Sequence, residues 1–214
     1  METATPVQRR VPRPRADALR NRERIVAAAR EMFVEFGAEV PFDEIARRAG
    51  VGNATVYRNF PDRDALAREV VCSVMDRTSE QIETALAEGG DAFEALSRFA
   101  HGAADERIGA LCPMLSETFD QHHPDLVAAR HRITGLVDEL MERARASGQL
   151  RPDVGTGDLM IALSQLTRPL PGTACQGIDR FAHRHLQLFL DGMRAPARSV
   201  LPGVAATMED LRGA

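Results

Sequence analysis

The residues with the clearest chemical potential lie between 53 and 60, where polar side chains alternate with two apolar ones. Val56 and Phe60 are four residues apart and would anchor one face of a helix, which leaves the other face bare. In a DNA major groove, Arg can pair two-pronged with guanine and Asn with adenine, and each such pair discriminates by about 1–3 kcal/mol. Arg58 could therefore read a guanine, and Asn53 or Asn59 an adenine. The bare face that we expect to contact double-stranded DNA comprises Asn53, Ala54, Thr55, Tyr57, Arg58 and Asn59.

A reading face of this kind must be positioned by a second helix and a tight turn. We expect helices over residues 42–49 and 53–60, with Gly50 and Gly52 supplying permissive backbone between them and Pro61 ending the second. Two short helices joined in this way form a helix-turn-helix. The residues that would pack the first helix inward are Phe42, Ile45, Ala46 and Ala49.

The elements on either side of this motif also read as helices. An apolar stripe begins after Asp17, follows the 3.6-residue period, and stops at Gly37. Asp62 can cap a long helix that continues toward Leu86, because its carboxylate accepts from free N–H groups. The stripe of the first helix comprises Ile25, Ala28, Ala29, Met32, Phe33 and Phe36.

These motifs together strongly resemble the TetR-type family of bacterial transcription regulators. The resemblance rests on the stripe that ends in Gly37 and on four segments, Glu44-Ile45-Ala46, Ala49-Gly50-Val51, Thr55-Val56-Tyr57-Arg58-Asn59-Phe60-Pro61 and Asp62-Arg63-Asp64-Ala65-Leu66. It implies that Thr55 and Tyr57 contact phosphate and the groove wall, and that Arg63 meets a phosphate.

The chain departs from the family pattern at three positions around the motif. Pro41 stands where a Ser or Thr usually caps the second helix, Gly52 where Ser is frequent, and Asn53 where Lys is frequent. Asn53 could take over the capping role. The operator preference of better-known members therefore cannot be transferred.

The rest of the chain predicts further helices, so the expected fold class is all-α. These helices cover residues 91–104, 111–119, 124–147, 156–167 and 178–193. The expected organisation is a disordered basic arm (1–16), a helix-turn-helix domain (17–63), a larger helical domain (64–194) and a loose tail (195–214). The resemblance implies that the larger domain binds an effector and forms a homodimer.

The last two expected helices are the candidate dimer face. Two helices from each subunit can close a four-helix interface, although the same residues could instead pack within one subunit. A dimer would place two reading helices about 34–36 Å apart, which predicts a near-palindromic operator. The candidate residues are Leu159, Leu163, Leu166, Ile178, Phe181, His185 and Leu188.

A pocket for a small hydrophobic effector is expected among the middle helices. Met and Phe at helical spacing also suit an ordinary core, so this alternative stays open. The candidate lining residues are Phe93, Phe99, Met114, Leu115, Phe119 and Met141.

Charge and motif content narrow the function further. Residues 1–63 carry a net charge of +3 and residues 64–214 a net charge of −7, which suggests that the front of the chain faces phosphate. No nucleophile elbow, phosphate-binding loop, dinucleotide fingerprint or set of metal ligands occurs, so we expect no enzyme activity, no cofactor and no metal. Isolated cysteines and the lack of a long apolar run predict a cytoplasmic protein, associated with the nucleoid when bound to DNA.

The sequence therefore predicts a DNA-binding regulator, with a repressor released by a small effector as the leading hypothesis. The alternatives are a ligand-independent regulator or an activator with the same fold, and an adaptor that binds proteins through helical grooves. An adaptor would not need the pattern from Thr55 to Pro61.

Overall fold

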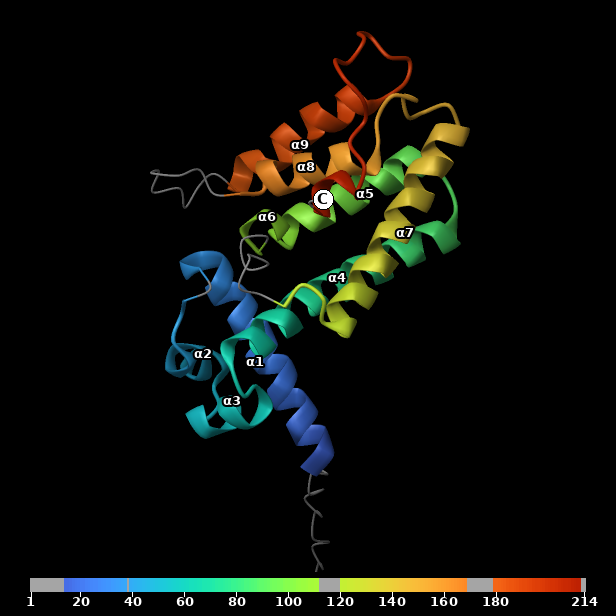
Figure 1. The fold of residues 1–214 in the computed structure, drawn as a ribbon. Helices are drawn as coiled ribbons and strands as arrows, with labels where there is room; N and C mark the ends of the chain where they lie inside the picture. The colour runs from blue at the N-terminus through green and yellow to red at the C-terminus, as the bar shows by residue number, and fades with distance from the viewer. Residues whose placement is uncertain (1–13, 38, 112–119, 169–178, 213–214) are drawn as a thin grey trace, which may run out of the picture.

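A computed structural model describes residues 14–37, 39–111, 120–168 and 179–212, and these residues form helices joined by turns (Figure 1). Within these ranges there is no strand, and the one isolated bridge pairs Leu150 with Arg194. The predicted all-α fold class is confirmed. The helices are α1 Pro14–Phe36, α2 Phe42–Ala49, α3 Asn53–Asn59, α4 Arg63–Glu88, α5 Ala92–Asp105, α6 Ile108–Leu111, α7 Pro124–Ala146, α8 Thr156–Leu166, α9 Asp179–Met193 and the 3₁₀ helix η2 Asp210–Arg212.

The first three helices and the first half of α4 form one compact unit, residues 14–74, which we call the reading head. Its core is built from the predicted stripe of α1, the inward residues of α2, and Val56 and Phe60. Helix α1 begins at Pro14, so residues 14–16 are helical and do not belong to a disordered arm as predicted. The arm up to residue 13 lies outside the described residues.

The turn between α2 and α3 explains why two glycines stand there. Gly50 ends α2 in the left-handed region with a φ of 63°, where a side chain would be strained and its Cβ would lie 2.6 Å from Arg24 Nη2. Gly52 has an ordinary φ of −72°, so only Gly50 needs the freedom that the sequence suggested for both.

Helix α4 carries the chain from the reading head into the remaining helices, which we call the body, residues 75–212 (Figure 1). Asp62 caps α4 as predicted, since its carboxylate accepts a hydrogen bond of 2.7 Å from the Ala65 amide. Leu66, Val70 and Val74 belong to the core of the head, whereas Ile82 belongs to that of the body. Helix α4 therefore contributes to both cores, whereas the expected domain border lies at residue 63.

The body packs α5, α7, α8 and α9 around a second core. Phe93, Leu96, Leu140 and Leu163 are all fully buried there. The short helix α6 begins at Ile108, earlier than the expected start at 111, and residues 112–119 lie outside the described part of the chain.

The C-terminal tail is not loose as predicted, because it returns to α8 and is held by hydrogen bonds. Gly157 donates its amide to the Ala206 carbonyl at 3.0 Å, and the Ala206 amide donates to Asp158 Oδ1 at 3.1 Å. A Cβ at Gly157 would lie 2.5 Å from the Ala206 backbone, so glycine is what allows this close approach. Arg151 adds a bond of 2.7 Å to the Ser199 carbonyl.

Among the described helices, none combines the length and apolar character that a membrane span requires.

Candidate DNA-binding surface and internal cavity

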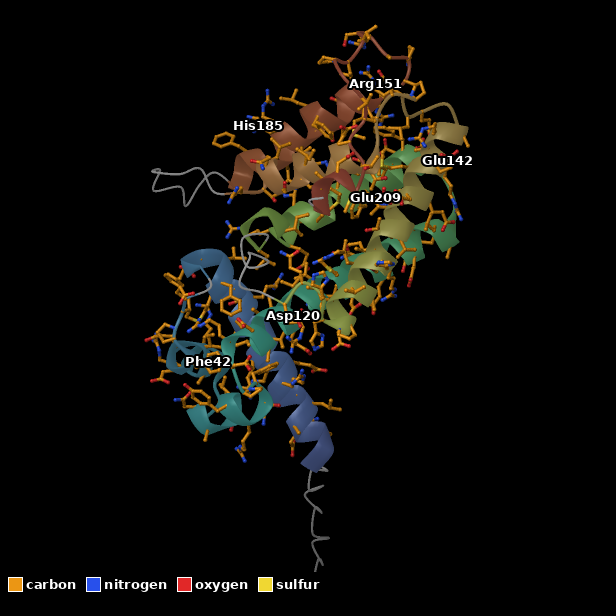
Figure 2. All side chains as sticks on the ribbon, in the orientation of Figure 1. Phe42, Asp120, Glu142, Arg151, His185 and Glu209 are labelled. Carbon is orange, nitrogen blue, oxygen red and sulfur yellow. The ribbon has the colours of Figure 1, made fainter. Side chains whose placement is uncertain are left out.

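Helix α3 exposes one face to solvent, and the residues on its opposite face anchor it in the core of the head. Val56 and Phe60 are buried in the head, which confirms their predicted anchoring role. Asn53, Ala54 and Arg58 are exposed, and Tyr57 is 54% exposed. The Tyr57 ring lies 5.1 Å from the ring of Phe42, which is labelled in Figure 2, so the start of α2 supports this exposed tyrosine.

The polar side chains of this face are already oriented by local hydrogen bonds. Arg58 lies along the helix, donating to the Ala54 carbonyl at 3.1 Å and to Thr55 Oγ1 at 3.0 Å. Asn53 does not cap α3, since Gly52 occupies the cap position and the Asn53 amide donates to Asp43 Oδ1 at 2.6 Å. Neither Arg58 nor Asn53 must give up a buried contact to reach a base.

Asn59 and Arg63 are less accessible than the sequence suggested. Asn59 is half-buried and donates its side-chain amide to the Thr55 carbonyl at 2.7 Å. Arg63 is also half-buried; its Nη1 donates to the Val40 carbonyl at 2.8 Å and its guanidinium lies 5.9 Å from the centre of the Phe42 ring. Both residues help to fix the position of the reading face.

Arg22 of α1 holds α3 in place, and the sequence reasoning missed it. Its guanidinium lies 4.4 Å from the centre of the Phe60 ring and donates to the Asn59 carbonyl at 3.2 Å. It also makes two bonds to the Glu69 carboxylate, at 2.8 and 3.2 Å. One side chain thus ties α1, α3 and α4 together, and only the tertiary structure reveals these partners.

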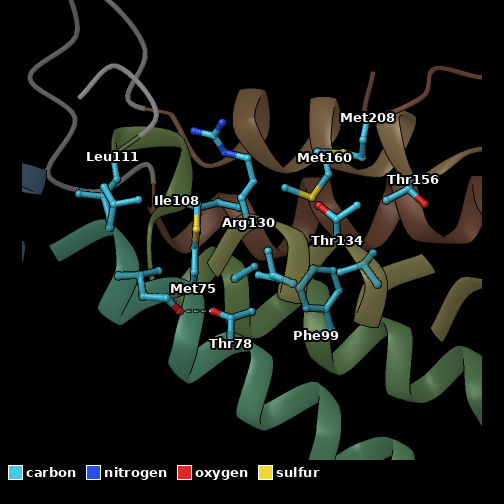
Figure 3. A pocket seen from close by; sticks show the side chains of 15 residues that line it. Met75, Thr78, Phe99, Ile108, Leu111, Arg130, Thr134, Thr156, Met160 and Met208 are labelled. Carbon is cyan, nitrogen blue, oxygen red and sulfur yellow. Dashed lines mark hydrogen bonds between the residues drawn. The ribbon is translucent and has the colours of Figure 1, made fainter. Parts of the chain in front are cut away.

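A cavity of about 190 Å³ lies where the two cores meet (Figure 3). Val71 and Val74 belong to the core of the reading head, against which Leu111 of α6 packs, and Phe99 belongs to the core of the body. Ile108 packs against both cores. The other lining residues are Met75, Thr78, Ala103, Arg130, Ile133, Thr134, Val137, Thr156, Met160 and Met208.

The cavity offers little polar chemistry. Thr78 Oγ1 donates to the Val74 carbonyl at 2.8 Å, and Thr156 Oγ1 is bonded to Asp138. Within the described residues, Thr134 is the lining threonine whose hydroxyl has no hydrogen-bond partner. Arg130 also lines the cavity and has an interaction of its own within the protein.

An ionic cluster joins the reading head to the body beside this cavity. Glu106, at the end of α5, accepts hydrogen bonds from Arg30 of α1 and from Arg77 of α4, the latter at 2.8 Å. Burial opposes the ionisation of Glu106, but the hydrogen bonds and charges of the two guanidinium groups outweigh it and lower its pKa. The carboxylate is therefore ionised at neutral pH and links three helices.

The comparisons with known proteins agree with this architecture. A family model described as "Bacterial regulatory proteins, tetR family" matches residues 25–70, and one for a "Transcriptional regulator SbtR-like, C-terminal domain" matches residues 88–195. The chain belongs to the TetR family. It is a DNA-binding transcriptional regulator of the helix-turn-helix type.

Two solved structures are similar to this TetR-family chain over most of its length. A TetR transcriptional regulator from Streptomyces coelicolor is 31% identical, covering 82% of this chain and 99% of its own, with a TM-score of 0.63. A TetR transcription regulatory protein from Mycobacterium vanbaalenii is 32% identical, covering 84% and 98%, with a TM-score of 0.59. An HTH-type transcriptional regulator of Staphylococcus aureus is 40% identical over 58 residues, which are 27% of this chain and 31% of that relative. The match to this curated relative thus spans about a third of its length.

Some of the residues predicted to line a pocket do line the cavity, and others do not. Phe99 lines it, but Phe93 and Met141 do not and are buried in the body core. Phe93 instead lies under the Arg194 guanidinium, 4.1 Å from its ring centre. The remaining candidates, Met114, Leu115 and Phe119, lie outside the described residues. The lining residues that the prediction missed come from α4, α5, α6, α7, α8 and the tail, and the meeting of these elements at one place is not visible in a sequence pattern.

The predicted dimer face divides between the protomer's own core and its surface. Leu159 and Leu163 are fully buried within the protomer, which is a correction, and Leu166 is half-buried. Phe181, His185 and Leu188 share the outward side of α9, with Phe181 42% and Leu188 60% exposed. On α8 the exposed apolar residue is Ile161, at 41%. Ile178 lies outside the described residues.

The inward side of α9 is tied to α5 by a pair of histidines. His101 Nδ1 and His183 Nδ1 are 2.9 Å apart, and the outer nitrogens of the pair contact Gln187 Oε1 at 3.1 Å and Asp105 Oδ1 at 3.0 Å. His183 and His185 face different sides of the helix. Helix α9 thus connects a cavity-lining helix with the outward apolar face.

Proposed function

We propose that the protein is a homodimeric repressor that leaves its operator when a small apolar effector fills the cavity between its two cores. The position of that cavity carries the proposal. A ligand lodged against Val71, Val74 and Leu111 would act directly on α4 and α6, which pack into the reading head. Because a ligand shifts a conformational equilibrium only by its differential affinity, an effector must prefer the head position that does not fit DNA.

Operator reading is proposed for the exposed face of α3. Asn53, Ala54, Thr55, Tyr57 and Arg58 supply it, and its local hydrogen bonds keep it ordered before DNA arrives. We also propose that Asn59 and Arg63 lie at the edge of this face and hold it in position. In addition, Arg63 contacts a DNA phosphate.

The test of operator reading begins with selection of bound fragments from a genomic DNA library, followed by gel shifts at moderate salt. Arg58→Ala should weaken binding to the selected site by about 1–3 kcal/mol, which is roughly 5- to 150-fold. The matched control is Arg98→Ala, an exposed arginine on α5 far along the chain, which should bind as the wild type does. Unchanged binding by the Arg58 variant, with helicity intact in both proteins, would remove Arg58 from the reading face.

Dimerisation is proposed through the outward face of α9 with Ile161 of α8. Phe181 and Leu188 are exposed apolar residues on the same side of α9 as His185, and such a face suits a self-complementary two-fold contact. Leu188→Glu should shift the protein from dimer to monomer in light scattering and abolish cooperative binding to both half-sites. Val204→Glu, on an exposed valine of the tail, is the control and should remain dimeric. A dimeric Leu188 variant would place the interface elsewhere.

Effector release can be tested without knowing the effector. Ala103 lines the cavity, so Ala103→Phe should fill part of it and act as a permanent ligand. We expect weaker operator binding while the dimer and the helicity persist. If the filled variant binds the operator as tightly as the wild type does, release through this cavity is wrong, and a ligand-independent regulator or an activator becomes the better description.

A further inference from the structure

We infer that the effector is a small, uncharged aromatic molecule that carries one hydroxyl or carbonyl group and bonds Thr134 through it. This inference rests on the proposed effector role of the cavity and names the ligand class. Four properties of the cavity lead to it: its volume, its mostly apolar lining, its sulfur-rich wall and its one unpaired threonine hydroxyl group.

The volume limits the ligand to one ring and a few further atoms. A dry cavity of about 150 Å³ lined by aliphatic and aromatic side chains binds benzene. The cavity between the two cores measures about 190 Å³, which leaves room for a small substituent on such a ring. A single ring with such a substituent therefore fills this volume.

The lining excludes a charged group from the interior. Transfer of an ionised carboxylate into apolar surroundings without a partner is strongly unfavourable. Val71, Phe99 and Val137 offer it no donor. Arg130 is already engaged, and Figure 3 shows its guanidinium pointing away from the other labelled side chains. The ligand that fits is therefore neutral.

The wall favours an aromatic ring over an aliphatic chain of the same size. Met75 of α4, Met160 of α8 and Met208 of the tail bring three thioethers to one cavity, and Phe99 adds a ring. A sulfur at the edge of an aromatic ring contributes about 0.3–1.5 kcal/mol, and pairs of rings attract beyond the area that they bury. Met208 reaches the cavity because the tail is held against α8.

Thr134 is the residue that would form a hydrogen bond with a polar group of the ligand. The hydroxyls of Thr78 and Thr156 are bonded to the protein itself, at Val74 and Asp138. The half-buried Thr134 hydroxyl has no partner among the described residues and can both donate and accept. A phenol, an aromatic alcohol or an aromatic ketone would satisfy it.

The experiment compares three para-substituted toluenes of nearly equal size by calorimetry with the full-length dimer at neutral pH. They are p-cresol, p-xylene and 4-methylbenzoate, which differ in carrying a hydroxyl, a methyl or a carboxylate. We expect p-cresol to bind about 2- to 12-fold more tightly than p-xylene, the range for one net hydrogen bond, and 4-methylbenzoate not to bind. Thr134→Val should erase the preference for p-cresol and leave the affinity for p-xylene as it was.

Thr84→Val is the matched control, because its hydroxyl donates to the Glu80 carbonyl on the exposed side of α4. It should keep the wild-type preference. Equal affinities of the wild type for p-cresol and p-xylene, or tighter binding of 4-methylbenzoate, would overturn the inference.

Gel shifts with the same compounds separate this inference from the proposed function. If p-cresol binds through Thr134 but leaves the operator complex intact, the ligand class stands and effector release fails. If none of the three binds and a larger or charged compound dissociates the complex, release stands and the ligand class is wrong.

Discussion

The reading head and the body are both built from helices, but different interactions define them. In the head, α2 and α3 are short, and a left-handed glycine, two anchors and one bridging arginine fix their relative position. In the body, long helices pack side by side. Which of their residues come into contact depends on the tertiary arrangement of the helices. The cavity lies between these two kinds of packing. The surface that we propose to read DNA thus lies on the locally fixed unit, and the cavity lies between this unit and the body.

The largest expected effect comes from breaking the head while leaving the body intact. Phe60→Ala removes a fully buried ring and the surface under Arg22, which should cost about 3–5 kcal/mol. Operator binding should disappear, whereas the dimer should persist in light scattering, because Phe60 belongs to the core of the head. Loss of the dimer in parallel with DNA binding would show that head and body unfold as one unit.

A second change breaks the body at its tail. Gly157→Ala should destabilise the protein by about 1–3 kcal/mol, because the new Cβ would lie 2.5 Å from the Ala206 backbone. Limited proteolysis should then cleave after residue 200 faster than in the wild type, with operator binding retained.

Gly135→Ala is the control for this prediction. A Cβ at Gly135 meets nothing within 4 Å on α7, so the change should stabilise the helix by up to about 1 kcal/mol. Equal proteolysis of the tail in the two variants would contradict the close approach at Gly157.

The link between the two units should respond to pH. Glu106→Gln should cost about 1–2 kcal/mol at neutral pH, between the values for exposed and buried ion pairs. The pKa of Glu106 is lowered from its ordinary value of 4.5, so its contribution is present above that value and is lost as pH falls through the lowered pKa. The stability difference between wild type and variant, measured by urea unfolding, should therefore shrink in acid.

Glu142→Gln serves as the control for the link, since Glu142 forms an exposed pair with Arg145 within α7. It should change stability by less than about 0.5 kcal/mol at any pH. A Glu106 difference that persists unchanged at low pH would mean that the carboxylate charge is not what joins the units.

The same contrast explains what the sequence could predict. The bounds of α2, the anchors Val56 and Phe60, and the Asp62 cap follow from period and turn chemistry within a few residues, and the structure has them. The burial of Leu159 and the absence of Phe93 from the cavity depend on which helices become neighbours. An apolar stripe indicates that one face of a helix is buried, but it does not indicate which element packs against that face.

The sequence pattern does not predict the contacts of the tail or the ionic links, for a related reason. Residues after Ala195 carry prolines and glycines and no periodic stripe, so a loose tail was the natural prediction. Hydrogen bonds between the backbone of Ala206 and the residues Gly157 and Asp158 hold the tail. A glycine within a helical pattern does not indicate which segment packs against it. Arg22 and Glu106 similarly have partners far along the chain.

The smallest expected effect tests whether the head can be improved by local chemistry alone. Gly52 occupies the N-cap of α3 with an ordinary φ of −72° and no side-chain cap, and a Cβ there would make an ordinary contact of 4.0 Å with Thr55 Oγ1. Gly52→Ser should therefore stabilise the protein by a few tenths of a kcal/mol, because a serine oxygen can accept from the free amides of the first turn. The matched change Gly50→Ser should instead destabilise it, since Gly50 has a φ of 63° and Arg24 blocks the Cβ position. Urea unfolding of the two variants gives the answer: the head is governed by local turn chemistry only if these two neighbouring glycines respond with opposite signs.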